Sequence, residues 1–265
     1  MTNDPIIVAC SEDLGEVVAS RVLGAIEQAG ERQFLLGSPT GRTPAPVFEP
    51  LARGLAERGL DPRRLTVVLM DEYLTDDLSL VDPALEYSCV GYADRYIVDP
   101  IRQATGLVPQ VWHADPASPA DYDRRIAEAG GIDLFLLASG ATDGHIAFNQ
   151  PGAEADSVTR IIELGERTRQ DNVHTWPSMT SIDEVPRHGL GVGVGTIVGL
   201  SRTAIMMLTG EDKHTAYERI LNAAGYEPDW PATAVREIPD HLIVADVAAT
   251  HHINDCLGAA ESITH

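Results

Sequence analysis

The sequence is poor in basic residues and in long apolar runs. Its 265 residues include 19 Lys and Arg against 40 Asp and Glu, so the formal net charge is −21. A field of that sign repels nucleic-acid phosphates and anionic lipids, so we expect no nucleic-acid partner and no membrane-surface role. The longest apolar stretches, 132–138 and 204–208, are far shorter than the roughly 18 residues of a membrane-spanning helix. The N-terminus lacks the basic start and apolar run of a secretory signal, which predicts a cytoplasmic protein.

Cysteine and lysine are rare as well. The three cysteines, Cys10, Cys89 and Cys256, have no CxxC spacing, so we predict small buried or idle thiols and assign them no chemistry. Lys213 is the only lysine, and it is expected in the first turn of a helix. Because cations are disfavoured at a helix N-terminus, this lysine is better explained if it faces an anion than if it lies on a solvated surface.

The sequence alternates short apolar runs with longer amphipathic segments, which is typical of βα units in a parallel sheet. We predict a single α/β domain over residues 1–265, with a mostly parallel sheet and helices on both faces. The predicted strands are 6–9, 34–36, 65–70, 133–138, 203–208 and 242–245. The predicted helices are one that begins at 44 and the segments 14–28, 87–96, 120–129, 212–222 and 247–260.

Two patterns that could suggest a cofactor or a metal do not support one. The glycines of 189–195 do not match G-x-G-x-x-G and are read as a turn with close packing, so no dinucleotide is implied. His251 and His252 are neighbours on the last predicted helix and therefore point to different faces. We predict no metal and no cofactor.

The segment after the second predicted strand, Gly37-Ser38-Pro39-Thr40-Gly41-Arg42-Thr43-Pro44, is a glycine-bearing loop with hydroxyls that leads into a helix. In open parallel sheets, ligands bind at the carboxyl ends of the strands. A helix N-terminus offers free N–H groups there, so the loop could hold a phosphate. A tight turn with an ordinary cap is an equally good reading of this loop alone, and the loop does not match GxxxxGK[ST].

Two adjacent acids, Asp71 and Glu72, follow the third predicted strand, where we expect the chain to break into a loop. Such a carboxylate is often a helix cap or a surface charge. At a strand end that faces a ligand, it could instead be the general base for a carbon acid.

The segment after the strand at 133–138 contains Asp143-Gly144-His145 within a loop rich in turn residues. This spacing gives a titratable imidazole with a carboxylate close enough to tune it. A lone histidine is more often structural, but the surrounding glycines and proline favour a functional site.

Taken in order, these segments resemble the glucosamine-6-phosphate deaminase/isomerase family, which shares a superfamily with the 6-phosphogluconolactonases. The pieces that carry the resemblance are LLGSPTGRTP, VVLMDEYL, IDLFLLASGATDGHIAFNQPG, TRIIELGERTRQDN, VGVGT, MLTGEDKHTA and LIVADVAA. Among them, MDEY and DGHIAFN resemble the deaminase branch. The resemblance implies a modified Rossmann-like sheet, no metal, and conversion of a hexosamine 6-phosphate to fructose 6-phosphate and ammonia.

The resemblance also implies roles for individual residues. Asp71 matches the base that moves a proton between sugar carbons 1 and 2. His145 matches the imidazole that opens the pyranose ring, Asp143 matches its neighbouring acid, and Lys213 matches a phosphate-binding lysine. The residues that match the phosphate loop are Thr40, Gly41 and Thr43, and Ser38 and Arg42 lie in the same loop.

Four positions depart from the family pattern. Gln150 replaces a glutamate that pairs with the histidine, and we expect the amide to keep that hydrogen bond without its charge. Ser139 and Thr142 add bulk and hydroxyls where the sugar should lie. His174 replaces an arginine of the phosphate site, for which Arg42 could compensate. Of a basic pair that forms an effector site in some relatives, only Arg160 remains, and Ile161-Ile162 follow it.

These departures leave two other readings open. The protein could act on a different phosphosugar, as an isomerase without ammonia release or as a lactonase. It could also be a catalytically weakened relative that binds phosphosugars. Relatives vary in assembly, so a homo-oligomer is compatible with the resemblance.

Overall fold

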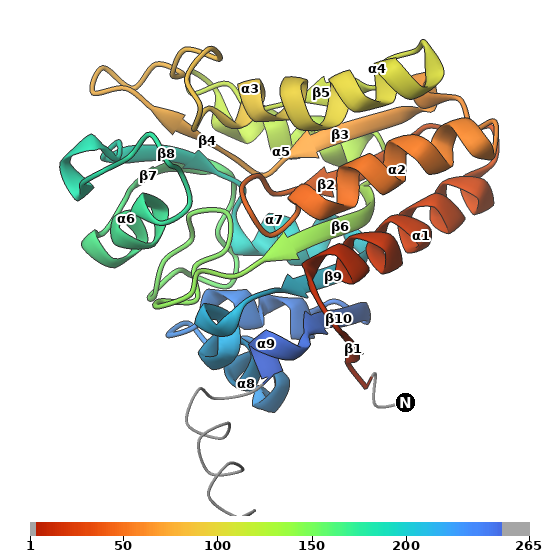
Figure 1. The fold of residues 1–265 in the computed structure, drawn as a ribbon. Coiled ribbons are helices and arrows are strands. Elements are labelled where there is room, and N and C mark those ends of the chain that lie inside the picture. Colours follow the sequence, from red (N-terminus) through yellow and green to blue (C-terminus); the bar gives the residue numbers. More distant parts are fainter. Residues whose placement is uncertain (1–3, 251–265) are drawn as a thin grey trace, which may run out of the picture.

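The computed structural model describes residues 4–250 and has a seven-stranded sheet at its centre (Figure 1). The strand order is β1-β10-β9-β6-β2-β3-β5, and every pair of neighbours is parallel. The strands are β1 Ile6–Val8, β2 Phe34–Ser38, β3 Leu65–Leu69, β5 Gln110–Trp112, β6 Ile132–Ala138, β9 Ser201–Leu208 and β10 Asp240–Asp246. The predicted α/β class with a mostly parallel sheet is confirmed.

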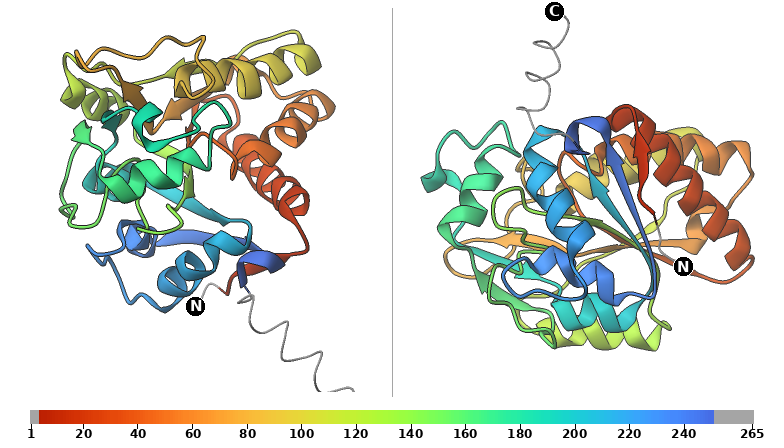
Figure 2. Two further views of the ribbon diagram at one scale, coloured as in Figure 1. Left: turned by 60° about the vertical axis from the view of Figure 1, so that its left-hand side comes forward. Right: turned by 90° about the horizontal axis from the view of Figure 1, so that it is seen from below.

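Helices cover both faces of this sheet (Figure 2, right). They are α1 Ser11–Ala29, α2 Ala45–Glu57, α3 Cys89–Ala93, α4 Asp99–Thr105, α5 Pro119–Glu128, α6 Glu166–Val173, α7 Val194–Leu200, α8 His214–Asn222 and α9 Val247–Thr250. Neighbouring residues of a strand point to opposite faces. Accordingly, Leu36 and Val67 pack in the core with α1 and α2, whereas Leu35 and Val68 pack in the core with α5 and α8.

A smaller antiparallel sheet, which the sequence did not predict, lies beyond the carboxyl ends of the main strands, at the left in Figure 1. Its order is β4-β8-β7, with β4 Asp71–Leu74, β8 His188–Gly191 and β7 Arg160–Glu163. Two predictions are therefore wrong: Asp71 begins a strand instead of a loop, and the glycines at 189–191 belong to a strand instead of a turn. The close packing does occur, because a Cβ on Gly191 would lie 2.2 Å from the carbonyl oxygen of Ala147.

The remaining helical predictions hold with shifted ends. The helix expected at 87–96 is α3, which continues through a π-helical turn, Asp94–Val98, into α4. The start of the last predicted helix is α9, while His251, His252 and Cys256 lie outside the described residues. Within residues 4–250, we find no helix with the length and apolar character needed to cross a membrane.

Candidate active site

A pocket of about 500 Å³ opens at the carboxyl edge of the main sheet. Segments that are far apart in the sequence meet there, as expected for the strand ends of a parallel sheet. Four predicted site residues lie outside its wall. Gly41 borders a neighbouring pocket of about 590 Å³, and Asp143 lies behind His145. Ser38 is buried with its hydroxyl on the carbonyl of Pro39, and Gln150 bonds to the backbone at the start of α6. The predicted site residues that line the pocket are Thr40, Arg42, Thr43, Asp71, His145, His174 and Lys213.

Lys213 supplies a buried cation to this pocket. It ends a short 3-10 turn before α8, and its side chain is only 9% exposed. Burial lowers the pKa of Lys213, and the nearby carboxylate of Asp212 opposes that shift. Its Nζ donates to the carbonyl oxygen of Ser139 at 2.7 Å, while the Ser139 hydroxyl turns to its own loop and donates to Gly140. An ammonium has three donors, so Lys213 retains the capacity to bind an anion.

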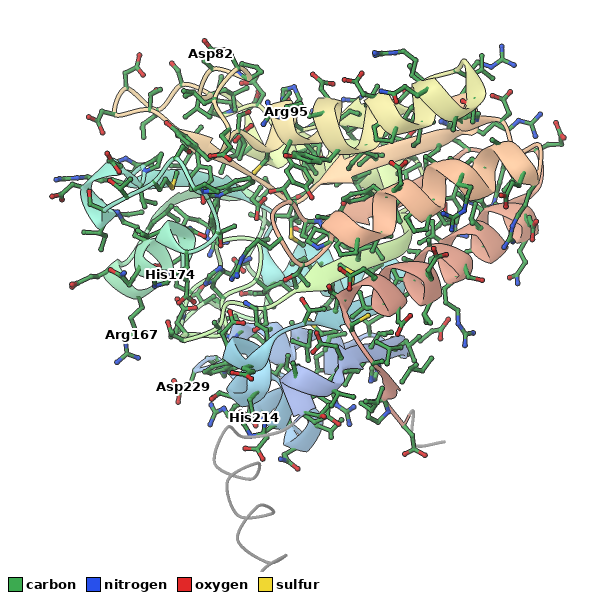
Figure 3. The ribbon with its side chains drawn as sticks, viewed as in Figure 1. Asp82, Arg95, Arg167, His174, His214 and Asp229 are labelled. Carbon is green, nitrogen blue, oxygen red and sulfur yellow. The ribbon has the colours of Figure 1, made fainter. Side chains whose placement is uncertain are left out.

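An arginine and a histidine line the same pocket. Arg42 lies in the loop before α2 and pairs with Asp212 at 3.3 Å, where both side chains are about half exposed. His174 follows the last residue of α6 and is exposed (Figure 3). Because Arg42, His174 and Lys213 come from three separate segments, this part of the pocket is suited to a phosphate.

Asp71 is the first residue of β4 and contributes a carboxyl to the pocket. Burial raises the pKa of Asp71 to about 7, and the thiol of Cys89 opposes the shift by a hydrogen bond. The Cys89 sulfur donates to Asp71 Oδ1 at 3.5 Å and accepts the hydroxyl of Thr40 at 3.2 Å. A carboxyl that titrates near neutrality is suited to give and take a proton at one site.

Glu72 has a different role, because neighbouring strand residues face opposite ways. Its carboxylate is 2% exposed and accepts the hydroxyl of Ser88 and the backbone N–H groups of Cys89 and Val90, all within 2.9 Å. Glu72 therefore caps the start of α3 and holds Cys89 beside Asp71. The helix-cap reading of the acid pair therefore applies to Glu72, and the general base stays a prediction for Asp71.

Asp143 and His145 form a hydrogen-bonded pair. The imidazole Nδ1 lies 2.7 Å from Asp143 Oδ1, which also accepts the backbone N–H of His145 at 3.0 Å. Burial alone would raise the pKa of Asp143, but the adjacent imidazole and the hydrogen bonds outweigh it and hold that pKa well below its ordinary value. Gly140 is needed here, since a Cβ on it would lie 2.2 Å from the imidazole Nδ1.

Asp171 on α6 clamps the loop that carries this pair. Its carboxylate accepts the backbone N–H groups of Ala141 and Thr142 at 2.9 and 3.0 Å, and the Thr142 hydroxyl at 2.9 Å. With Asp143 and His145, it brings three potential metal-ligand atoms within 4.8 Å of one another. The carboxylate oxygens of Asp143 and Asp171 accept N–H and O–H donors, which fix the loop in place.

Comparison with known proteins identifies the family. A family profile described as glucosamine-6-phosphate isomerases/6-phosphogluconolactonase matches residues 9–244. The chain belongs to this family.

Individual family members show how far the likeness extends. A glucosamine-6-phosphate deaminase from Arthrobacter sp. is 36% identical over 214 residues, which cover 80% of this chain and 78% of the relative. One from Bacillus velezensis is 34% identical over 248 residues, which cover 92% and 98%. The solved structure of a monomeric glucosamine-6-phosphate deaminase, 26% identical, has a TM-score of 0.81 and covers 93% of this chain and 98% of that one. A 6-phosphogluconolactonase from Thermotoga maritima, 17% identical with a TM-score of 0.65 and coverage of 92% and 100%, shares the fold alone.

Gln150, which departs from the family pattern, does not act as predicted. Its Nε2 donates to the carbonyl of Glu163 at 2.7 Å, and its Oε1 accepts the backbone N–H of Gly165 and lies 3.2 Å from the Thr168 hydroxyl. The imidazole Nδ1 pairs with Asp143 instead. The expected direct bond between the amide and the imidazole is wrong, because the side chain is held against the start of α6.

Arg160, the remnant of the basic pair, supports the pocket wall from behind. Ala147 and Phe148, which line the pocket, have φ of 48° and 61°, a left-handed conformation that costs non-glycine residues roughly 1–2 kcal/mol each. Asn149 holds this turn by donating to the carbonyls of Ile146 and Val192 at 2.8 and 2.7 Å. Arg160 in turn donates to the side-chain oxygen of Asn149 at 2.9 Å.

Three of the pocket residues that the sequence analysis missed contact other groups of the site. Cys89 touches the carboxyl of Asp71, although we assigned it no chemistry. Tyr73 and Trp176 also line the pocket, and the Trp176 indole N–H donates to the Tyr73 hydroxyl at 3.3 Å. The only available signal was that Tyr73 belongs to the MDEY segment.

Proposed function

We propose that this protein converts glucosamine 6-phosphate and water to fructose 6-phosphate and ammonia. The observation that carries the proposal is a single pocket containing a carboxyl that titrates near neutrality, a carboxylate-paired imidazole and a buried lysine. These are Asp71, His145 and Lys213. Membership of the family, and relatives at 36% and 34% identity that are named glucosamine-6-phosphate deaminases, support the same activity.

The phosphate would bind at the cationic side of the pocket. Lys213 and Arg42 supply positive charge, His174 supplies a ring N–H, and Thr40 and Thr43 supply hydroxyls. The backbone N–H groups at the start of α2 favour the same anion. This binding holds the sugar so that its carbons 1 and 2 can reach the carboxyl of Asp71.

Ring opening is the task of His145. A neutral imidazole takes the proton of the carbon 1 hydroxyl and passes it to the ring oxygen, which gives the open-chain aldehyde. Asp143 keeps the ring oriented and stabilises the imidazolium that forms in between, as the carboxylate of a catalytic triad does. The aldehyde in turn makes the hydrogen on carbon 2 acidic.

Asp71 then moves a proton between the two carbons. Its carboxylate removes the proton from carbon 2 and returns it to carbon 1. In the same conversion the carbon 1 oxygen gains a proton and the amine loses one, so carbon 1 carries a hydroxyl and carbon 2 an imine. Water adds to this imine and ammonia leaves, so the products are fructose 6-phosphate and ammonia. The reaction balances with water as the only co-reactant, so the proposal requires no metal and no cofactor. We further propose that the protein works in the cytoplasm.

The Asp71→Asn variant tests the proposal together with the wild type. We expect ammonium release from glucosamine 6-phosphate to fall by about 10³-fold or more, because general base catalysis is lost. Calorimetric binding of the phosphosugar should change little, since the phosphate site is intact. Full activity in this variant would exclude the role of Asp71. Tight binding by the wild type without turnover would favour a phosphosugar-binding protein.

A further inference from the structure

The carboxylate of Asp143 has a second partner, which comes from α6. Its Oδ1 pairs with the His145 imidazole, while its Oδ2 accepts the hydroxyl of Thr168 at 2.5 Å. Thr168 is 1% exposed and Asp143 is 2% exposed, so little water competes for this bond. Hydrogen bonds from a hydroxyl to an ionised carboxylate are short and strong. Thr168 therefore fixes the rotation of the carboxylate that orients the imidazole.

Gln150 determines where the Thr168 proton goes. Two backbone groups orient its amide: Nε2 faces the Glu163 carbonyl, and Oε1 faces the Gly165 N–H. Oε1 is thereby left 3.2 Å from the Thr168 hydroxyl as a second acceptor. A neutral amide oxygen is a weaker acceptor than a carboxylate, so the hydroxyl proton goes to Asp143.

A glutamate at position 150 would reverse this preference. One of its oxygens would take the place of Nε2, which lies 2.7 Å from the Glu163 carbonyl, and no proton would lie between these two acceptors. The other oxygen would carry charge and compete with Asp143 for the Thr168 hydroxyl. The amide is therefore the group that suits this arrangement of Thr168 and Asp143.

We propose that Thr168 is a positioning residue of the Asp143–His145 pair, and that Gln150 is the neutral partner that keeps the Thr168 hydroxyl on Asp143. The expected effect on kcat rests on the proposed function, whereas the expected effect on exchange of the proton between His145 and Asp143 does not. Because Asp171 on the same helix clamps the loop at Ala141 and Thr142, α6 holds the pair from two points.

The test compares the wild type with Thr168→Val, which keeps the shape and removes the hydroxyl, and with Thr168→Ser, which keeps the hydroxyl. Arg167→Ala is the matched control, since Arg167 is the exposed neighbour on α6 and points away from the body of the molecule (Figure 3). NMR of the protein without ligand measures water exchange of the proton between His145 and Asp143. Steady-state assays with glucosamine 6-phosphate give kcat and KM for each variant.

We expect Thr168→Val to speed this exchange by about tenfold or more and to lower kcat by about ten- to hundredfold, the effect of losing a hydrogen bond to a charged group. KM should stay within about twofold, because the phosphate site is untouched. Thr168→Ser should restore both readouts, and Arg167→Ala should match the wild type. Gln150→Glu should speed the exchange as Thr168→Val does, and it carries the same test should Thr168→Val not fold.

Unchanged exchange in folded Thr168→Val or in Gln150→Glu would overturn the proposal, as would failure of Thr168→Ser to restore it. A wild type that releases no ammonium would instead overturn the proposed function. The exchange measurement would still decide the role of Thr168, since it needs no turnover.

Discussion

The thiol of Cys89 lies 3.5 Å from Oδ1 of Asp71 and accepts the Thr40 hydroxyl at 3.2 Å, so it connects the phosphate loop to the proposed carbon base. Glu72 holds the thiol in this position, because its carboxylate accepts the backbone N–H of Cys89 at the start of α3. A thiol that donates to Asp71 stabilises the ionised carboxylate and opposes the effect of burial.

The acid limb of the activity profile should therefore respond to residue 89. Asp71 is a base only when ionised, so activity should rise with pH through its pKa of about 7. A hydroxyl is a stronger donor than a thiol, so Cys89→Ser should move this midpoint to lower pH, and Cys89→Ala should move it to higher pH. The measurement is kcat/KM from about pH 5 to 9. Identical midpoints in the two variants would contradict the contact.

The titratable groups that interact electrostatically with Asp71 are Glu72, Tyr73, Cys89, Tyr122 and His145.

The raised pKa of Asp71 also makes the site a source of instability. Burial moves this pKa from 3.8 to about 7, so the folded state prefers the protonated form and loses stability as pH rises through that interval. We expect Asp71→Asn to raise the free energy of unfolding by about 1–3 kcal/mol at pH 8 and to give little gain at pH 4. Urea titrations at both pH values provide the comparison. An equal gain at both would show that ionisation is not the cause.

Lys213→Met should raise the thermal stability of the protein and lower its affinity for a phosphosugar. Burial lowers the pKa of Lys213, so the charged form weakens the folded state at neutral pH, and an apolar side chain of similar length removes that cost. We expect a higher melting temperature at pH 7. The affinity for a phosphosugar should fall by about thirtyfold or more, the effect of removing one partner of a buried charge pair. The affinity for the unphosphorylated sugar is the control, because a comparable fall there would argue against a phosphate contact.

His174→Arg should strengthen phosphate binding. His174 lines the pocket with Arg42 and Lys213. A guanidinium binds phosphate with two parallel N–H donors, whereas an imidazole can direct only one ring N–H at it. We expect KM to fall several-fold. A KM that rises with arginine at this position would place His174 outside the phosphate contacts.

The sequence predicts the main sheet well because its strands are continuous apolar runs that end in polar loops. β2, β6, β9 and β10 contain the segments predicted for them, and β3 ends one residue before its predicted end. The small sheet was missed for physical reasons. β4 begins with two acids, and β8 is rich in glycine because a Cβ on Gly189 or Gly191 would collide with the turn at Ala147 and Phe148.

The candidate site also has a part that the sequence predicts and a part that it does not. Asp71, His145 and Lys213 stand at strand ends, so their convergence follows from the topology. The partners of these residues do not follow from spacing. Cys89 reaches Asp71 across 18 residues, and Thr168 reaches Asp143 across 25 residues from a helix that folds back over the loop. We predicted a bond from Gln150 to the imidazole, but its amide forms hydrogen bonds with the backbone at Glu163 and Gly165 instead.

The most direct test of the account is to incubate the wild type with glucosamine 6-phosphate and to quantify ammonium and fructose 6-phosphate in the same sample. The account predicts that both appear in a one-to-one ratio and that Asp71→Asn yields neither. No ammonium from glucosamine 6-phosphate, together with a ketose formed from a hexose 6-phosphate that carries a hydroxyl on carbon 2, would show an isomerase. Acid release from a phosphosugar lactone without any deamination would show a lactonase, and either result would contradict the proposed function.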